Sequence, residues 1–325
     1  MRVLVTGGAG YIGSHIVHAL QRRGDEAVVV DDLSSGSTRR LPGAEFVHVD
    51  LASDLAPSQL RTALAGCQAV VHLAARKRVD ESVQRPGWYL HQNLVPLANL
   101  LLALEESDVR TFVFSSSAAV YGATQGEAIA ETDATLPMNP YGHSKLTGER
   151  LLEAASGSLG LRAASLRYFN VAGAGLPALA DTAELNLIPM ALGRIRRGEP
   201  VLIFGDDYPT ADGTCVRDFI HVEDLADAHL TALDALRTGP PRSEIYNVGT
   251  GRGASVAEVI DAIEARAGRE VAREFRSRRV GDPAIVVADV ERIGRELGWR
   301  ARYGLADIID SAVSATVPTE APRAV

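Results

Sequence analysis

Two side chains near the middle of the chain have the types and spacing that proton transfer requires. Tyr141 and Lys145 lie at positions i and i+4 of the stretch NPYGHSKLTGER, near the start of an expected helix, so both project from one face. Only Lys77 and Lys145 are lysines among 33 basic residues, and arginine serves everywhere else. An ammonium group beside a tyrosine stabilises the phenolate. The pair therefore predicts a general acid/base whose pKa is lowered toward a working range.

A serine hydroxyl is expected beside this pair. Ser117 follows an apolar run in RTFVFSSSAAVYG, at the carboxyl end of an expected strand, where ligands of open α/β sheets bind. It is well placed to hydrogen-bond the substrate oxygen from which Tyr141 removes a proton. A cap at the strand end is the alternative. Ser117, Tyr141 and Lys145 together have the order and spacing of a catalytic triad.

The first expected strand leads into a glycine loop typical of dinucleotide binding. Gly7, Gly10 and Gly13 follow RVLVT and open an amphipathic helical stretch. Such glycines permit a tight turn, close approach of the backbone to a pyrophosphate and close packing of helix on strand. An ordinary turn is the alternative for the loop alone. Asp31, 18 residues after Gly13, supports the dinucleotide because its carboxylate can accept hydrogen bonds from the adenosine ribose.

The choice between NAD and NADP also depends on Asp31. Its carboxylate would repel the 2′-phosphate of NADP, although Arg39 and Arg40 nearby point the other way. Asp50, at the end of the third strand, could reach the adenine amino group or could be a solvated strand end. With its three donors, Lys145 can bond both hydroxyls of a nicotinamide ribose, which a planar guanidinium fits badly. We predict NAD as the cofactor.

The elements that position these residues follow an alternation of strand and helix. Short apolar runs separated by helix-length stretches predict an α/β fold with a Rossmann-like, doubly wound parallel sheet and a smaller mixed α/β C-terminal substrate lobe. We expect a NAD-binding domain over 1–172, a lobe over 173–315 that mainly binds substrate and crosses back to the sheet, and a disordered tail over 316–325. The expected strands are RVLVT, EAVVVD, AEFVHVD, QAVVHLA, RTFVFSSS and LRAASLRYFN. The helices expected in the lobe are AELNLIPMALGRIRRGE, VEDLADAHLTALDALR, SVAEVIDAIEARAG and LADIIDSAVSA.

Composition narrows the class of protein and its partners. The 325 residues carry a net charge of −8 without a basic block, which argues against nucleic acid or a membrane surface as the partner. Two cysteines are too few for a disulfide framework, and the first residues enter a strand without a secretory segment, so we expect a cytoplasmic protein. The histidines lack partners at metal-ligand spacing, so no metal site is expected.

Several longer segments resemble one known family. The glycine loop and the segments SSSAAVYG, NPYGHSK, LRYFNVAGA, IFGDDYPTADGTCVRDFIHVEDLADAH and YNVGTG are similar to the extended short-chain dehydrogenase/reductase superfamily, and within it to the UDP-glucose 4-epimerases. The resemblance implies that NAD stays bound and takes the C4 hydride of a UDP-hexose while Tyr141 takes the 4-hydroxyl proton. It further implies that a 4-keto sugar turns over in the pocket and that hydride return inverts C4.

The resemblance also implies further contacts. Lys77 would lie beside the nicotinamide ribose, although Arg76 and Arg78 allow a solvated charge cluster instead. Arg217 and Arg279 would grip a diphosphate, or else be ordinary surface residues. The implied cofactor contacts are Gly7, Gly10, Tyr11, Ile12, Gly13, Asp31, Asp32, Ser34, Ser35, Asp50, Leu51, Leu73, Ala74, Ala75, Lys77, Asn93, Ser115, Tyr141, Lys145, Tyr168 and Phe169. The implied UDP-sugar contacts are Lys77, Ser117, Tyr141, Asn170, Asn186, Leu187, Leu202, Phe204, Arg217, Arg279, Asp282 and Val286.

Two other functions compete with this interpretation. A nucleotide-sugar 4,6-dehydratase or decarboxylase begins with the same oxidation, but related dehydratases place Asp and Glu directly after the Ser or Thr. This chain has Ala118 and Ala119 there, and alanine cannot transfer a proton. A noncatalytic NAD-binding regulator would need only the cofactor site, so the joint presence of Ser117, Tyr141 and Lys145 argues against it.

The resemblance bears on substrate breadth and assembly as well. The residue four past Asp282 limits the sugar pocket in the family, and Val286 in place of a bulky tyrosine implies some activity on UDP-GlcNAc and UDP-GalNAc. The stretch GWYLHQNLVPLANLLLALEE and the helix starting at Tyr141 are apolar on more than one face. Homologues pair these helices in a four-helix contact, so we expect a homodimer.

Overall fold

Side chains that alternate along the strands create a hydrophobic core on each face of a large sheet. The computed structural model describes residues 1–123, 128–279 and 281–316. In β1 (Arg2–Thr6), Val3 and Val5 are buried on one face and Leu4 on the other, because successive residues of a strand point to opposite sides. The first face packs against α1 (Tyr11–Arg22) and α7 (Val222–Ala235), and the second against α2 (Ala56–Ala63), α4 (Pro86–Glu105) and α5 (Pro140–Leu159). This arrangement confirms the doubly wound α/β fold class.

The large sheet contains every strand that the sequence predicted and one more. Its order is β10-β6-β5-β4-β1-β2-β3, and all neighbouring strands are parallel. The additional strand is β10 (Arg242–Val248), which pairs with β6 at one edge. The other strands are β2 (Glu26–Asp31), β3 (Glu45–His48), β4 (Ala69–His72), β5 (Thr111–Ser115) and β6 (Arg162–Tyr168).

The strand order creates a crevice at one point of the sheet. From β1 the chain runs outward through β2 and β3, then returns to place β4, β5 and β6 on the other side of β1. Ligands of such sheets bind outside the carboxyl ends of the strands, where the order reverses. Here that point lies between β1 and β4, so the glycine loop after β1 and the loop after β4 meet there.

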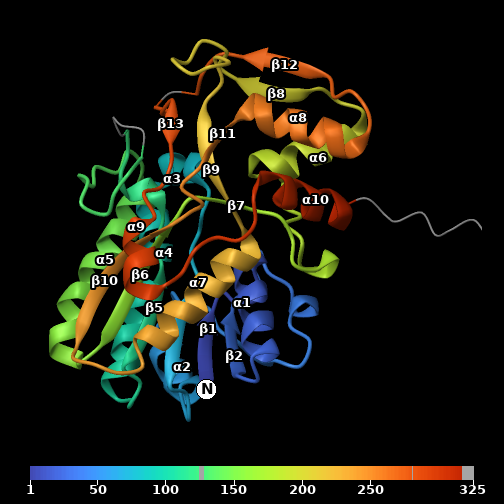
Figure 1. Ribbon diagram of the computed structural model, residues 1–325. Helices are drawn as coiled ribbons and strands as arrows, with labels where there is room; N and C mark the ends of the chain where they lie inside the picture. The colour runs from blue at the N-terminus through green and yellow to red at the C-terminus, as the bar shows by residue number, and fades with distance from the viewer. Residues whose placement is uncertain (124–127, 280, 317–325) are drawn as a thin grey trace, which may run out of the picture.

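A smaller lobe lies beyond the carboxyl ends of these strands (Figure 1). Its helices and short strands share a core that includes Ile188, Val201 and Ile260. Two small sheets belong to it, one with the order β11-β9-β13 and β7 beside β9, the other made of β12 and β8. Its elements are β7 (Asn170–Ala172), α6 (Leu187–Arg197), β8 (Val201–Phe204), β9 (Val216–His221), β11 (Gly253–Ser255), α8 (Val256–Ala267), β12 (Arg273–Arg276), β13 (Ile285–Val286) and α10 (Leu305–Thr316).

The boundary between the two parts is crossed more than once. After the first strands of the lobe, α7 packs on the large sheet, β10 forms its edge strand, and α9 (Glu291–Leu297) packs beside them. Thr316 ends α10, so it does not belong to the predicted disordered tail, and the rest of that tail lies outside the described residues.

Two kinds of feature are absent from the described residues. No helix in those ranges has both the length and the apolar character needed to cross a bilayer. Over the same residues, no cluster of three or more His, Cys, Asp or Glu side chains is arranged to hold a metal ion.

Candidate active site

Helix α5 brings Tyr141 and Lys145 into one buried position. The Asn139 side chain caps the helix by accepting a hydrogen bond from the Gly142 amide at 2.9 Å, and Pro140 occupies the first turn. Tyr141 is 9% exposed and Lys145 is 4% exposed. The Lys145 ammonium lies 5.9 Å from the centre of the Tyr141 ring and donates a 2.7 Å hydrogen bond to the Ser115 carbonyl at the end of β5. The predicted side-chain pair is therefore assembled.

A single cavity of about 870 Å³ connects this pair with both parts of the molecule. It lies against the carboxyl ends of the sheet strands and is also lined by the smaller lobe. The predicted residues that line it are Gly7, Gly10, Tyr11, Ile12, Gly13, Asp31, Asp32, Ser34, Ser35, Asp50, Leu51, Leu73, Ala74, Ala75, Lys77, Ser117, Tyr141, Lys145, Tyr168, Phe169, Asn170, Asn186, Arg217, Arg279, Asp282 and Val286.

Five of the predicted residues do not line the cavity. Asn93 and Ser115 act behind it: Asn93 hydrogen-bonds both the backbone of Arg76 and the Ser144 hydroxyl, and Ser115 accepts the Lys145 bond. The other three, Leu187, Leu202 and Phe204, belong to the smaller lobe.

The pKa of Tyr141 corrects one expectation. Burial, the largest cause, raises the pKa of the phenol, and the hydrogen bond with Ser117 lowers it by less. The net direction is upward, whereas the spacing to Lys145 predicted a lowered value. The prediction was wrong because it counted the neighbouring charge and not the loss of water around the phenol. In the protein alone, Tyr141 therefore rests as a neutral phenol.

Burial acts on Lys145 in the opposite direction. It lowers the pKa of the ammonium to about 8, while the carboxylate of Glu149 raises it. Glu149 lies one helical turn beyond Lys145 on α5 and is itself buried, held by a bidentate ion pair with Arg167 and by the Ser116 hydroxyl. The lysine thus keeps most of its charge at neutral pH although it is almost fully buried.

The glycine loop has the shape that a dinucleotide requires. Gly7 has φ +71°, and a Cβ there would come within 2.7 Å of the Ala74 amide nitrogen. A Cβ on Gly13 would collide with the Gly7 carbonyl oxygen, so the close packing of α1 on the loop depends on glycine. Within the described part of the chain no side chain caps the N-terminus of α1, and the first residues of this helix line the cavity. Free amides at a helix N-terminus favour a phosphate group there.

Asp31 lies beside this loop with part of its hydrogen-bonding capacity unused. Its carboxylate accepts bonds from the amides of Ala9, at 3.1 Å, and Leu33, at 2.8 Å. A carboxylate has room for about four hydrogen bonds, so two ribose hydroxyls can still be accommodated. Burial raises the pKa of Asp31, and the two amide bonds oppose that shift. These residues fit the adenosine half of a dinucleotide.

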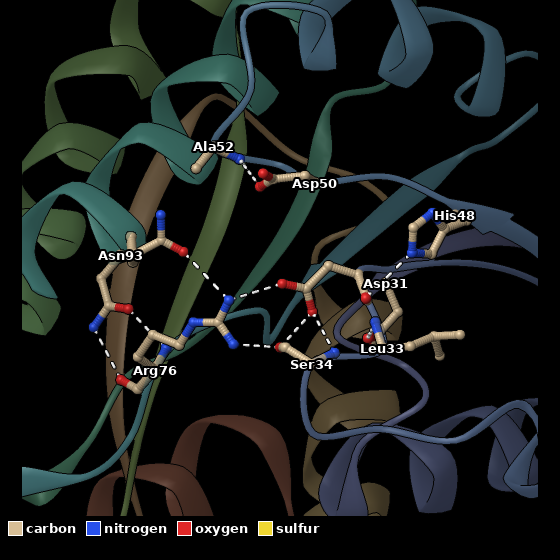
Figure 2. Close-up of polar contacts among 10 residues, drawn as sticks. Asp31, Leu33, Ser34, His48, Asp50, Ala52, Arg76 and Asn93 are labelled. Carbon is tan, nitrogen blue, oxygen red and sulfur yellow. Dashed lines mark hydrogen bonds and ion pairs between the residues drawn. The ribbon is translucent and has the colours of Figure 1, made fainter. Parts of the chain in front are cut away.

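Arg76, next to Lys77, was not among the predicted site residues. Its guanidinium lines the cavity and donates to the Asp32 carboxylate at 2.8 Å. It also donates to the Ser34 hydroxyl (Figure 2). The alternative of a solvated charge cluster is therefore wrong for Arg76, while it holds for Arg78, which is exposed and paired with Asp80.

The far end of the cavity carries the predicted arginines. Arg217, on β9, forms an ion pair with Asp282, and its side chain is only 12% exposed. It is therefore no ordinary surface residue. Arg279 is exposed but lines the cavity, and its guanidinium lies 4.2 Å from the centre of the Phe204 ring. This contact brings Phe204 to the edge of the site through Arg279.

Residues 3–249 match the NAD dependent epimerase/dehydratase family, which is more than half of the chain. The chain belongs to this family. It is 46% identical to the UDP-glucose 4-epimerase of Azospirillum brasilense over 320 residues, which are 96% of this chain and 91% of that protein. Another relative, the UDP-glucose 4-epimerase of Halalkalibacterium halodurans, is 41% identical over 93% of this chain and 91% of its own length.

Solved structures of family members have the same fold. UDP-glucose-4-epimerase from Stenotrophomonas maltophila, with bound NAD and formylated UDP-arabinopyranose, is 40% identical and has a TM-score of 0.91, with 97% of each chain covered. The UDP-Glc/GlcNAc 4-epimerase from Campylobacter jejuni is 38% identical and has a TM-score of 0.83, with 97% of this chain and 98% of that chain covered. The resemblance found from the sequence segments is confirmed.

Several lining residues were not among the predicted site residues. Arg40, which the sequence indicated only as a residue that favours NADP, lines the cavity and donates a hydrogen bond to the Ala180 carbonyl at 2.8 Å, so it joins the loop after β2 to the segment before α6. Asp181, Thr182 and Leu185 in that segment also line the cavity. These residues reach the site only because segments distant in the sequence fold against the same cavity, and no local sequence pattern predicts such a contact.

Proposed function

We propose that this protein is an NAD-dependent UDP-glucose 4-epimerase, which interconverts UDP-galactose and UDP-glucose by inverting C4 through a transient 4-keto sugar. One observation carries the proposal: a single cavity joins the glycine loop, the buried Tyr141 and Lys145, and the arginines of the smaller lobe. A cofactor and a sugar nucleotide bound at its two ends would meet at the phenol. Curated epimerases with 38 to 46% identity, which the chain covers over nearly its whole length, support the same reaction.

The chain's own groups supply proton transfer and positioning. NAD, when bound, accepts the C4 hydride and returns it. The Tyr141 oxygen takes the proton of the sugar 4-hydroxyl and gives it back to the keto oxygen, so no net oxidation occurs. Ser117 donates a hydrogen bond to the same sugar oxygen, and its contact with Tyr141 favours the phenolate. Lys145 holds the nicotinamide ribose and adds a positive charge close to the phenol.

Binding is divided between the two parts of the chain. Residues 1–172 hold NAD, with the Asp31 carboxylate on the adenosine ribose and Lys77 beside the nicotinamide ribose. Residues 173–315 mainly hold the UDP-sugar, with Arg217 and Arg279 on the diphosphate. The Asp282 carboxylate that now pairs with Arg217 must share that guanidinium when phosphate oxygens arrive.

The competing dehydratase function lacks a required group. Elimination of water needs an acid beside the C4 chemistry, and Ala118 and Ala119 line the cavity directly after Ser117. Neither can donate a proton. A regulator that only binds NAD would have no use for a phenol and an ammonium buried together at the junction of the two half-sites.

The sugar pocket favours a broad substrate range. Val286 lies on β13, pairs with Arg217 in the backbone ladder and lines the cavity. Its side chain is smaller than the tyrosine expected in an enzyme restricted to plain hexoses, so we propose turnover of UDP-GalNAc and UDP-GlcNAc as well. Initial rates with UDP-galactose and UDP-GalNAc, measured in parallel for the wild type and Val286→Tyr, test this. The variant should lose N-acetyl turnover and keep hexose turnover.

Two further proposals concern assembly and compartment. Leu102 on α4 is 48% exposed and Leu151 on α5 is 36% exposed, on helices that pack side by side at one flank of the sheet. We propose that two copies pair these helices in a four-helix contact, which light scattering with Leu102→Glu tests. Cys67 and Cys215 are both free and buried, which agrees with a cytoplasmic protein.

Product analysis tests the main proposal. Incubation with UDP-galactose should give UDP-glucose of unchanged mass, without lasting production of NADH. Loss of one water from the sugar nucleotide would establish the dehydratase instead. No conversion by a preparation that contains bound NAD would refute both.

A further inference from the structure

We infer that Arg76 is a cofactor-retaining residue: its guanidinium bridges the loops after β2 and β4 across the adenosine end of the cavity and slows the release of NAD. The inference rests on the proposed function, because it concerns the cofactor of that reaction.

The strand order makes this contact a bridge across the crevice. Arg76 follows β4, and Asp32 and Ser34 follow β2, while β1 lies between these two strands in the sheet. Neighbouring strands are about 4.8 Å apart, so the two loops are separated by roughly 10 Å. The Arg76 side chain spans that gap above the end of β1, where the glycine loop begins.

The guanidinium is held by several acceptors in this position. It donates to the Asp32 carboxylate at 2.8 Å and to the Gln92 amide oxygen at 3.3 Å. A third bond goes to the Ser34 hydroxyl (Figure 2). The Trp88 ring lies 5.8 Å from its central carbon. Burial raises the pKa of Asp32, but the bonds from Ser34 and the charge of Arg76 outweigh this and lower it. Asp32 is therefore a charged partner at neutral pH.

The backbone of Arg76 is fixed as well, so the side chain starts from a defined point. The Asn93 side chain on α4 accepts a hydrogen bond from the Arg76 amide at 2.7 Å and donates one to the Arg76 carbonyl at 3.0 Å. A side chain held at its base and at its tip loses little further freedom when a ligand binds beneath it. All of these partners except Trp88 and Asn93 line the cavity.

A bridge across the mouth of the cavity affects the release of NAD more than the reaction itself. The side chains of Arg76 and Asp32 are 26% and 31% exposed, so the ion pair lies at the mouth of the cavity rather than in its interior. A dinucleotide that leaves past the loops after β2 and β4 must separate this pair. Partly exposed ion pairs are weakened by salt, so release should be faster at high ionic strength.

Displacement of a bound reduced cofactor provides the test, since it requires no turnover. The wild type and Arg76→Met are loaded with NADH and mixed with excess NAD, and the loss of NADH fluorescence is followed at low and high salt. We expect Arg76→Met to release NADH roughly 3- to 10-fold faster at low salt, the range that one partly exposed charged contact produces. Added salt should accelerate release from the wild type and have little effect on the variant.

Matched variants isolate the contribution of the bridge. Arg78→Met removes an exposed arginine of the same loop, outside the cavity lining, and should release NADH at the wild-type rate. Asp32→Asn should reproduce the Arg76→Met rate, and the double variant should add nothing further. Equal melting temperatures exclude an effect through unfolding, and Arg76→Lys should recover part of the retention.

The possible outcomes divide clearly. Faster, salt-insensitive release from Arg76→Met supports the bridge. Release at the wild-type rate with the wild-type salt dependence overturns it, as does a loss of NADPH binding with NADH binding unchanged, because the guanidinium would then serve a 2′-phosphate. A wild type that binds no NADH refutes the proposed cofactor site itself and is recognised before any variant is compared.

Discussion

Replacement of Glu149 by glutamine should destabilise the fold and change how the catalytic lysine titrates. The Glu149 carboxylate accepts hydrogen bonds from the Ser116 hydroxyl at 2.5 Å and from two nitrogens of Arg167 at 2.9 and 2.6 Å. The two charged side chains are 4% and 3% exposed. Glutamine keeps one oxygen acceptor but turns an amide NH₂ toward the guanidinium, so Arg167 remains buried without its counter-charge.

The size of the effect follows from this burial. Removal of one partner from a buried ion pair costs about 3–5 kcal/mol. Arg167 keeps a 3.0 Å hydrogen bond to the Tyr121 hydroxyl, so we expect the lower end, about 3 kcal/mol. Total stabilities are about 5–15 kcal/mol, and the variant should therefore still fold. Urea denaturation measures the change, and Glu184→Gln, which breaks an exposed pair with Arg197, should lose less than about 1 kcal/mol.

A second readout separates electrostatics from stability. Because the Glu149 charge raises the pKa of Lys145, the amide should let that pKa fall below its present value of about 8. Activity above neutral pH should then be lost at lower pH in Glu149→Gln than in the wild type. The lysine faces other titratable groups, which the variant leaves in place: Tyr141 on its own helix, and His72 on β4, a residue whose pKa the lysine lowers. A stability loss below about 1 kcal/mol, together with an unchanged loss of activity at alkaline pH, would refute the reasoning.

Three further predictions address buried titratable groups. Tyr141→Phe should lower the epimerisation rate roughly 10²- to 10⁴-fold in a product assay while NADH binding is retained, and near-full activity would contradict the assigned proton transfer. Lys145→Met should be inactive but, by urea denaturation at pH 7, more stable than the wild type by at most about 3 kcal/mol. The pKa of Lys145 is about 8 in the folded protein and 10.5 as the reference value, so the unfolded chain binds more protons between these two pH values. Wild-type stability therefore rises over this range, and the advantage of the variant shrinks. Burial lowers the pKa of His229 from 6.5 to about 4, so between these pH values the unfolded chain binds more protons than the folded one and the protein loses stability as the pH falls. His229→Gln should lose less stability than the wild type over the same pH range. Equal losses would contradict a buried neutral imidazole.

The sequence predicted the strands whose side chains are buried on both faces. β1, β2 and β4 are continuous apolar runs because helices cover both sides of the sheet. It did not predict β10, which lies at an edge and whose first four residues are only partly buried. Four of its seven residues, Arg242, Ser243, Glu244 and Asn247, are charged or polar, so an apolar run does not mark it. Its place in the sheet is set by its pairing with β6, which is a contact between distant segments.

In the site, too, the sequence predicted contacts between neighbouring residues and missed contacts between distant segments. The i, i+4 spacing correctly predicted that Tyr141 and Lys145 share a face of α5. It did not predict the bridge made by Arg76, because a run of charged residues is normally solvated and the acceptor Asp32 lies 44 positions earlier in the chain. It also missed the ion pair of Glu149 with Arg167, for which β6 has to lie beside α5. Types and spacing identify the reacting groups, whereas their pKa values depend on burial, which only the packed structure determines.

Burial also explains why position 145 carries a lysine in a chain that has only one other, Lys77, and otherwise uses arginine. Loss of water lowers the pKa of the Lys145 ammonium to about 8 and raises that of the Tyr141 phenol, so the two groups respond in opposite directions to the same environment. An arginine would keep its charge at any accessible pH and would spread it over a wide planar group, whereas the ammonium is a compact charge that lies 5.0 Å from the centre of the Phe114 ring. The ammonium can be buried because the Ser115 carbonyl accepts its bond and Glu149 supplies a counter-charge one turn away. Lysine at this position therefore depends on Glu149, and the ion pair with Arg167 is the contact that holds this carboxylate in place.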